Sequence, residues 1–581
     1  MKSLPAFLVS AALIGGGCSA WHGLVLSPQS PDRQEEETAE PRLVGDLASP
    51  FNPNPIAIES VGLVTGLKGT GSDPRPSSLR DALVFEMQKR GVKSPNALLA
   101  SKNASLVMVR AVLRPGIQKG DRFDVEVKLP PGSETTSLRG GYLLATELKQ
   151  LAVMSDWRVH EGHGYGVAEG PVLVDPSVSE KSGSTLAGRG RILGGGVALK
   201  SLPVGLALRK GRQSFANARS VESAVNRRFN LNERGSKIGV AKAKTDKYVE
   251  LRIHPRYKDN VPRYLAVVRS TVLRESEREL SVRLRTLEQE LLTPGATFRA
   301  ALELEAVGRP AVESLAKALQ SDNAEVRFFA AESLAYLDDT RAASALGDAA
   351  RNEPAFRVYA LAALTLLNDY SATEQLQDLL KVPSAETRYG AFRALSAMER
   401  KDPSLRGERL GGQFSYHVLD AADQPMIHVT RSRRAEIVLF GPDQRLVPPV
   451  ALEAGNQILV TGSAPGQITV SKFTVNEPDQ KRVVSDRVDE VIRAVVELGG
   501  TYPDVVQALQ QAKAAGALTG RLLVDALPEP GRIYDRVAET KPQKDGISEA
   551  QAAQGEAEGL STEEKPGPLR AFFTRMTGRG T

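Results

Sequence analysis

Few residues of this chain have the type and spacing that chemistry needs. Cys18 is the single cysteine, so neither an intramolecular disulfide nor a cysteine-based metal site can form. His160 and His163 are the close histidine pair, but no third ligand is identifiable and glycines surround them. Loop histidines are therefore favoured over a metal site.

A glycine-rich stretch, Gly66–Gly71 (GLKGTG), has the glycines of a phosphate-binding loop. It lacks the Gly-Lys-Ser/Thr order that places a lysine and a hydroxyl on the phosphates, which favours a structural turn. The sequence contains no Gly-x-Ser-x-Gly nucleophile elbow. Its carboxylate pairs lie on predicted helix faces and have the pattern of ordinary solvent-exposed residues, so none is singled out as catalytic. We predict a protein that is not an enzyme and needs no cofactor.

Length and composition indicate a multidomain globular protein. A chain of 581 residues is too long for one core, and about two to four domains are expected. Charged residues make up 25% and hydrophobic residues 41%, which are ordinary values for soluble proteins. The net charge of +6, from 75 basic and 69 acidic residues, is too dilute to imply a nucleic-acid partner.

The N-terminus predicts export. A basic start at Lys2 is followed by the apolar run Ala6–Ile14 and by glycines before Cys18, the pattern of a secretory signal. A cysteine after small residues resembles a lipoprotein cleavage site, so we predict lipid attachment at Cys18; plain cleavage and a tethered signal helix are the alternatives. The run is short for a membrane span. We assign residues 1–18 to the signal and 19–50, rich in proline and acidic residues, to a flexible tether.

Residues 51–292 have the sequence pattern of a mixed α+β region. Asn103–Leu113 is an almost unbroken β-prone run, and Arg122–Leu129 alternates between apolar and charged residues; both predict strands. The segment from Ser78 to Gly91 predicts a helix capped by Ser77 or Ser78. A second helix is expected over 220–229, a strand over 248–253 and a flexible glycine-rich loop over 183–196.

Residues 293–403 are rich in alanine and leucine, have the pattern of helices and contain an internal repeat. Arg327, Arg357 and Arg388 recur 30 and then 31 residues apart, each followed by alanine and leucine at fixed offsets. Leucines at 315, 346 and 376 precede each set, so every unit is a helix pair. This resembles short HEAT repeats, an α-solenoid that buries its core by stacking. The three arginines are expected to tie adjacent repeats together; a ligand-binding role is the alternative.

Residues 404–528 return to α+β texture. Strands are expected over 435–440, 457–460, 467–473 and 521–527, with a helix capped by Ser485 and another opened by Pro503. Residues 529–581 are rich in proline, glutamate and lysine and are predicted to be mostly disordered. Near their end, 567–578 could form a short basic amphipathic helix or a frayed terminus.

Five segments in order carry a family resemblance. They are VGLVTGLKGTG at 61–71, LVMV at 106–109, GDRFDVEV at 120–127, SLRGG at 137–141 and GVAEG at 166–170. Together they resemble the bacterial flagellar P-ring protein, and 491–504 and 507–518 resemble its C-terminal end. The resemblance covers Pro55–Leu273 and Ala435–Leu527, so we interpret the helical repeats as an insertion whose removal should leave the rest folded. The family-motif positions, taken as structural, are Gly62, Gly66, Gly69, Gly71, Ser137, Leu138, Arg139, Gly140 and Gly141.

The resemblance implies a fold class and a function. The expected fold is α+β, with β-rich P-ring-like domains interrupted by an all-α HEAT-like solenoid. The expected function is a structural subunit of the flagellar basal-body P ring, a homo-oligomeric ring around the rod in the periplasm that contacts the rod and outer-membrane ring proteins. Peptidoglycan and a protein bound by the HEAT-like segment are further candidate partners. The alternative is an envelope scaffold, anchored to the outer membrane, whose repeats bind a partner without a flagellar role.

Overall fold

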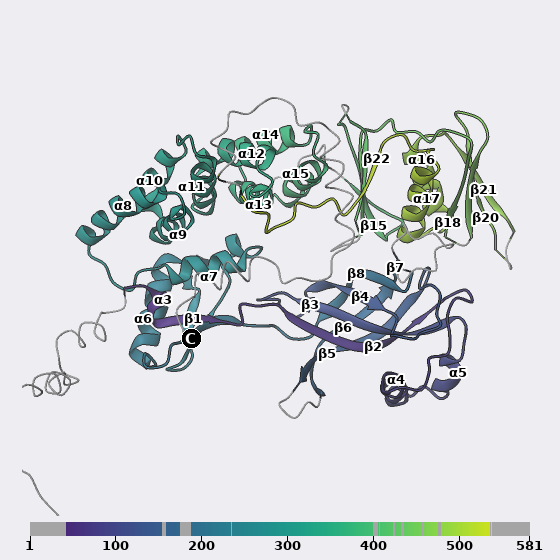
Figure 1. Ribbon diagram of the computed structural model, residues 1–581, viewed down its shortest axis with the longest axis horizontal. Coiled ribbons are helices and arrows are strands. Elements are labelled where there is room, and N and C mark those ends of the chain that lie inside the picture. The colour runs from purple at the N-terminus through teal and green to yellow at the C-terminus, as the bar shows by residue number, and fades with distance from the viewer. Residues whose placement is uncertain are drawn as a thin grey trace, which may run out of the picture.

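The computed structural model describes residues 42–536, except for 154–158, 175–186, 234, 399–404, 406, 422–423, 431–434, 456, 475–477 and 535. The predicted signal, Cys18, the tether up to residue 41 and the tail from residue 537 lie outside the described residues. Figure 1 shows four blocks in two rows. An N-terminal α/β block and a closed sheet form the lower row, and a helical array and a C-terminal block form the upper row.

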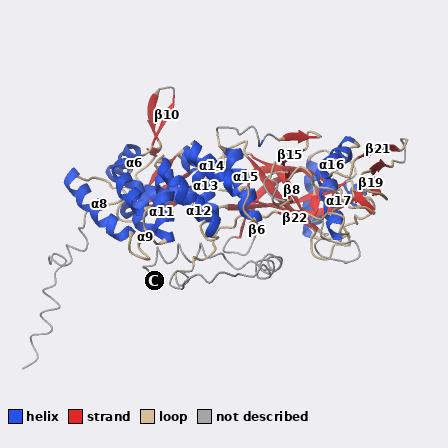
Figure 2. Cartoon of the chain, turned by 90° about the horizontal axis from the view of Figure 1, so that it is seen from above, coloured by secondary structure: helices blue, strands red, loops and turns tan. Residues whose placement is uncertain are grey.

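The N-terminal α/β block collects segments that are far apart in the sequence. Its antiparallel sheet has the order β1-β9-β13-β12, and α6 and α7 pack into one core with it. Ser214 caps α6 by accepting a hydrogen bond from the Asn217 backbone N–H. The block comprises α3 (Val44–Leu47), β1 (Ala48–Phe51), β9 (Val204–Leu208), α6 (Phe215–Arg228), β12 (Ala241–Ala243), β13 (Tyr248–Leu251), η1 (Pro255–Tyr257) and α7 (Val261–Arg269). A hairpin, β10 (Asn230–Glu233) with β11 (Ser236–Gly239), projects from it (Figure 2).

The closed sheet contains the strands that the sequence predicted most clearly. Its order is β4-β3-β2-β5-β6-β8-β7, and a further pairing of β4 with β8 closes it on itself. The pattern of burial alternates in β4, where Val125 and Val127 face the core. The strands are β2 (Ile56–Thr65), β3 (Ala104–Leu113), β4 (Arg122–Lys128), β5 (Tyr142–Val153), β6 (Val159–Pro171), β7 (Leu173–Val174) and β8 (Arg189–Ala198). Helices α4 (Ser78–Lys89) and α5 (Pro95–Leu99) lie at one end (Figure 1).

The helical array runs from Glu277 to Ala397. In each helix pair of the sequence repeat, the second helix carries the repeated arginine. The aligned leucines of the first helices, Leu315, Leu346 and Leu376, are fully buried. The central helix, α11, is buried on nearly all sides, as expected for a helix with neighbours on every face. The helices are α8 (Glu277–Leu291), α9 (Thr297–Val307), η2 (Arg309–Ala311), α10 (Val312–Ala318), α11 (Ala324–Tyr336), η3 (Thr340–Ala342), α12 (Ala343–Asn352), α13 (Arg357–Leu367), α14 (Tyr370–Leu379) and α15 (Ala385–Ala397).

The C-terminal block has two sheets with two helices packed in one core. One sheet has the order β14-β15-β17-β16-β22 and the other β18-β19-β20-β21. Thr501 and Asp504 form a capping box at the start of α17, with Pro503 in its first turn. The elements are β14 (Glu408–Leu410), β15 (Phe414–Leu419), β16 (Met426–Val429), β17 (Glu436–Phe440), β18 (Val450–Ala454), β19 (Ile458–Gly462), β20 (Ile468–Lys472), β21 (Gln480–Val484), α16 (Val488–Glu497), α17 (Tyr502–Ala514) and β22 (Arg521–Val524).

Three local predictions differ from the structure. Residues 189–196 of the predicted glycine-rich loop form most of β8, because their glycines leave room for neighbours such as the Phe123 ring, 2.1 Å from where a Cβ on Gly196 would lie. The helix predicted over 220–229 begins at Phe215 instead. Helix α16 is capped at Arg487 rather than at Ser485, whose hydroxyl accepts a hydrogen bond from the Arg487 N–H. Among the described residues, no helix combines the length and hydropathy of a membrane span.

The helical array is packed into both neighbouring blocks. On one side Leu302, Ala306 and Tyr336 belong to the core of the N-terminal α/β block. On the other, Met426 and Phe440 of the C-terminal sheet are fully buried in the core of the array. The array therefore covers an apolar face of each neighbour, which argues against the expectation that the rest would fold without it.

We predict that replacing residues 293–403 with a Gly/Ser linker yields a chain that has lost cooperative unfolding. The apolar faces that the array covers would become exposed, so the variant should bind a hydrophobic dye and melt over a broad range. Calorimetry and dye fluorescence measure this. A soluble variant with a sharp transition and no dye binding would show that the array is a separable insertion.

Candidate functional site

Two family-motif segments meet at one end of the closed sheet. The segment after β2 is held by backbone hydrogen bonds from Leu67 and Gly71 to the 102–103 loop. It also pairs with the segment before β5: the Thr136 N–H donates to the Thr70 carbonyl at 2.9 Å, and the Thr70 hydroxyl donates to the Ser137 carbonyl at 2.8 Å. The sequence places these segments about seventy residues apart, and the fold joins them in one corner.

Close packing explains some of the family-motif glycines, and a left-handed backbone explains the others. A Cβ on Gly71 would lie 2.2 Å from the Ala104 carbonyl oxygen, and Gly140 has a φ of +71°. Gly66 and Gly69 each have a φ of +81°, whereas a Cβ on Gly62 or Gly141 would lie within 3.0 Å of a neighbouring side chain. Leu138 is fully buried, and the Arg139 N–H donates to the Ser137 hydroxyl. The polar groups that hold this corner together are mainly backbone groups, so its geometry is that of a structural junction.

The repeated arginines bind carbonyl groups at the C-terminal end of the preceding helix. Arg327 donates to the carbonyls of residues 321 and 322, and Arg357 donates to the carbonyl of residue 350. Arg388 donates to the carbonyl of residue 380 and also to that of residue 424 in the C-terminal block. Arg357 reaches the next helix pair through Glu386 at 3.4 Å. A cation at a helix C-terminus is favourable because it offsets the unpaired carbonyls.

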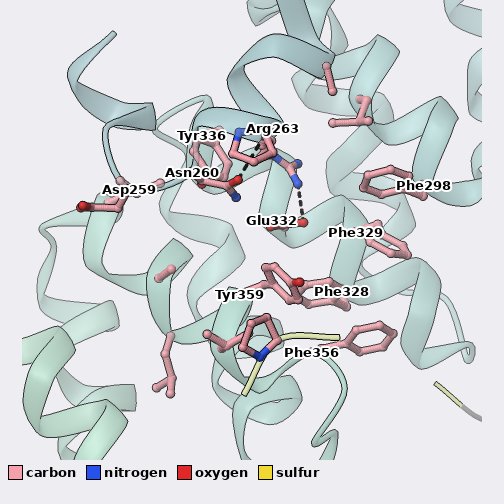
Figure 3. A pocket seen from close by; sticks show the side chains of 18 of the residues that line it. Asp259, Asn260, Arg263, Phe298, Phe328, Phe329, Glu332, Tyr336, Phe356 and Tyr359 are labelled. Atoms are coloured by element: carbon pink, nitrogen blue, oxygen red, sulfur yellow. Dashed lines mark hydrogen bonds and ion pairs between the residues drawn. The ribbon is translucent and has the colours of Figure 1, made fainter. Parts of the chain in front are cut away.

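A large groove lies between α7 and the helical array. Its volume is about 2900 Å³, and it is lined by α3, α7, helices α9, α11, α13 and α15, and the segment after β22. Figure 3 shows aromatic rings of the array along one wall, among them Phe298, Phe329 and Phe356, and Arg263 of α7 paired with Glu332. Phe328 and Phe356 stack with ring centroids 4.3 Å apart. This groove is the candidate binding site of the described residues.

A buried ionic cluster joins α7 to the array beside the groove. The Arg263 guanidinium contacts Glu305 at 2.6 Å and Glu332 at 2.5 Å, and all three side chains are at most 5% exposed. The Tyr257 hydroxyl donates to Glu305 at 2.6 Å, and Arg263 also donates to the Ser333 hydroxyl. Two carboxylates therefore share one guanidinium, and the Tyr257 hydroxyl adds a hydrogen bond to Glu305. Figure 3 shows the contact of Arg263 with Glu332.

The charges of this cluster depend on one another. Burial alone would lower the pKa of Arg263, but Glu305 and Glu332 raise it overall, so the guanidinium stays protonated. Burial raises the pKa of Glu332, an effect that the charge of Arg263 opposes. Burial and Glu305 together raise the pKa of Tyr257 well above its ordinary value. The cluster stabilises an internal joint and offers no free nucleophile.

Sequence reasoning missed this cluster. Glu305 and Glu332 stand within apolar stretches of helices, and a carboxylate at a position that helical periodicity assigns to the core is the signal that could have identified them. Their partner Arg263 lies in a different block, which no sequence spacing indicates. His160 and His163 fall in β6, but their side chains are not described. No metal-binding cluster occurs among the described residues.

Comparison with known proteins identifies a family that part of this chain resembles. Residues 45–285 match the model of a family described as "Flagellar P-ring protein". That family is structural rather than enzymatic, which confirms the prediction of a non-enzymatic protein for the matched region. The match covers the N-terminal α/β block and the closed sheet. The resemblance predicted for Ala435–Leu527 stays a prediction.

Curated relatives agree with this match. The flagellar P-ring protein of Nitrosospira multiformis is 30% identical over 246 residues, which is 40% of this chain and 60% of that protein. Those of Aquifex aeolicus and Thermotoga maritima are 29% and 30% identical over 34% and 36% of this chain, and over 52% and 60% of their own length. The chain thus spans less than two thirds of these relatives.

We predict that Arg263→Ala destabilises the protein by about 3–5 kcal/mol, because it leaves two buried carboxylates without their cation. The loss should be larger at pH 8 than at pH 5. Without Arg263, the folded-state pKa of Glu332 rises further above 4.5. A group whose pKa is raised by folding stabilises the fold below its unfolded pKa and loses that contribution as pH rises through the folded pKa. Denaturant unfolding at both pH values measures the difference.

Arg299→Ala is the matched control. Arg299 pairs with Glu290 at 2.9 Å, but both side chains are exposed to solvent, at 55% and 32%. Its removal should change the stability by less than about 1 kcal/mol at either pH. Equal losses for the two variants would contradict the importance of the buried cluster.

Proposed function

We propose that this protein is a structural subunit of the flagellar basal-body P ring, which assembles around the rod in the periplasm. The observation that carries the proposal is the match of residues 45–285 to the P-ring family, over two blocks of continuous fold. A ring subunit needs complementary faces on opposite sides of one protomer. The closed sheet, which has no free outer edge along most of its strands, is the proposed ring wall.

The proposal also covers the helical array and the C-terminal block, most of which lie outside the 45–285 match. We take the helical array as HEAT-like repeats inserted in a P-ring-like chain, supported by the repeat of Arg327, Arg357 and Arg388 and by the helix pairs that carry them. We take the C-terminal block as the continuation of the P-ring-like fold. The proposed partners are further copies of the chain, the rod, the outer-membrane ring proteins and peptidoglycan.

A second candidate function is an envelope scaffold, anchored to the outer membrane, whose helical array binds a protein partner without a flagellar role. The observation that favours it is the groove of about 2900 Å³ along the array. The residues that line its array side, such as Phe298 and Phe329, lie outside the 45–285 match. The two candidates differ in whether cells need the protein to swim.

We predict that deletion of the gene gives non-motile cells whose rods lack a periplasmic ring. The reason is that a missing ring subunit leaves the rod without its bushing. Swimming assays and electron cryotomography of basal bodies measure this, with the intact gene supplied on a plasmid as the control. Deletion cells that swim normally with complete basal bodies would refute the P-ring role and favour the envelope scaffold.

We further predict that Cys18→Ala abolishes fatty-acid labelling and releases the protein from membranes, because the thiol is the proposed lipid attachment point. Metabolic labelling and membrane fractionation measure this. Ser19→Ala, at the next position, should keep the label. An intact chain that takes up no fatty acid would contradict the anchor without affecting the proposed ring.

A further inference from the structure

The segment that follows β22 runs along the helical array. After Val524 the chain leaves the C-terminal sheet and crosses beneath α15 and α13 (Figure 1). We call residues 528–536 the strap. Its described residues form no helix or strand, and it lines the groove. The sequence predicted disorder from residue 529, whereas residues 529–534 and 536 have a described structure and Arg532, Tyr534 and Arg536 contact the array.

The strap contacts three successive second helices of the array. Arg532 donates to Glu386 of α15 at 2.6 Å. The Tyr534 ring lies 4.7 Å, centroid to centroid, from that of Phe356, which caps α13. Arg536 binds Glu325 of α11 through two parallel hydrogen bonds of 2.7 and 2.6 Å.

These contacts alternate along the strap. Residues 532, 534 and 536 face the array, whereas Ile533, between two of them, is 86% exposed. A period of two is the signature of an extended peptide whose alternate side chains face one surface. The array therefore contacts an arginine, an aromatic residue and an arginine at every second position.

The array presents matching groups at equivalent positions of its repeat. Glu325 and Glu386 are each the second residue of their helix, two repeats apart, and an aromatic surface lies between them. The side chain of Glu325 is only 6% exposed. A carboxylate that is so deeply buried requires a cation, and the two-pronged contact with Arg536 is the geometry in which a guanidinium supplies one. Arg357 holds the second carboxylate, Glu386, from the other side at 3.4 Å.

We propose that this side of the groove is a peptide-binding site for extended segments of a partner protein that carry two arginines four residues apart with an aromatic residue between them. The strap occupies the site as an internal copy of that ligand, and the partner segment binds by displacing it. The proposal names the chemistry of the partner that the scaffold function leaves open. It does not depend on the flagellar role, because it concerns the purified chain alone.

The strap also lowers the apparent affinity of the site for a partner segment, because it competes for the same contacts. An attached segment competes at a high effective concentration, on the order of millimolar for a short connection. The intact chain should therefore bind a free peptide weakly, and a chain whose strap cannot bind should bind it more tightly. This difference would show that the site accepts such a segment from a separate molecule, as a partner site must.

The test uses the full-length chain with Arg532→Ser, Tyr534→Ser and Arg536→Ser, and a synthetic peptide of the natural sequence 527–540 as the probe. Calorimetry or fluorescence anisotropy should show saturable binding at least about tenfold tighter than to the unaltered chain. Replacing either arginine of the peptide should weaken binding about tenfold, as for loss of a charged hydrogen bond. Absence of saturable binding, or equal binding of a scrambled peptide, overturns the proposal.

Variants of the array provide an independent check if the triple variant does not fold. Glu325→Gln in the otherwise unaltered chain keeps the shape of the side chain but removes the charge that holds Arg536. Trypsin should then cleave after Arg532 and Arg536 faster than in the unaltered chain. Glu313→Gln is the control, since Glu313 is 78% exposed and pairs with Arg341 of the array. Equal cleavage of all three chains overturns the proposal.

A second copy of the chain is the competing occupant. Mixing the triple variant with the Glu325→Gln chain tests it, because the first supplies a free site and the second a free strap. Mixed oligomers on size-exclusion chromatography, together with no binding of the isolated peptide, would replace the partner segment by a neighbouring copy and overturn the proposal. Monomeric chains that bind the peptide support it.

Discussion

The arrangement of the blocks depends on the guanidinium of Arg263. It lies between Glu305 and Glu332 at the point where α7 of the N-terminal α/β block meets α9 and α11 of the helical array. Charges with so little exposure are tolerated only when paired and hydrogen-bonded, and this pairing requires the two blocks to dock in one orientation. Tyr257 and Tyr336 stack beside it with their centroids 4.6 Å apart, which adds apolar contact to the same joint.

A second joint of the same kind connects the array to the C-terminal block. Glu436 of β17 is 1% exposed and receives hydrogen bonds from Tyr389 and Arg393 of α15. His428 stacks on the Tyr389 ring at 3.6 Å, and burial lowers the pKa of His428 to about 3, so it is neutral at physiological pH. The array is therefore fixed at both ends by a buried carboxylate that meets an arginine and a tyrosine.

The two buried joints explain how a P-ring-like region and a helical array are held together in one molecule. Residues 45–285 match a structural family, and the array is attached to them through buried contacts rather than through a linker alone. A groove whose walls belong to two blocks keeps its shape only while those joints hold. The strap lies in this groove, where Glu325 and Glu386 bind its arginines.

The sequence by itself determined the local structure and the family resemblance. The alternation in Arg122–Lys128, the apolar run of Ala104–Leu113 and the repeat of Arg327, Arg357 and Arg388 predicted strands and helix pairs close to those observed. These features follow from periodicities of two and 3.6 residues, which are properties of neighbouring positions. The motif glycines were identified through the family resemblance, and Gly66, Gly69 and Gly140 have the positive φ that tight turns require.

Only the tertiary structure decided the joints and the groove. Arg263, Glu305 and Glu332 meet across 69 residues of sequence, and Arg536 meets Glu325 across 211. No local pattern encodes such a pairing, since helical periodicity can place a carboxylate in the core but does not indicate which distant residue meets it. The glycines of β8 read as a loop for the same reason, because the Phe123 ring that fills their space comes from another strand.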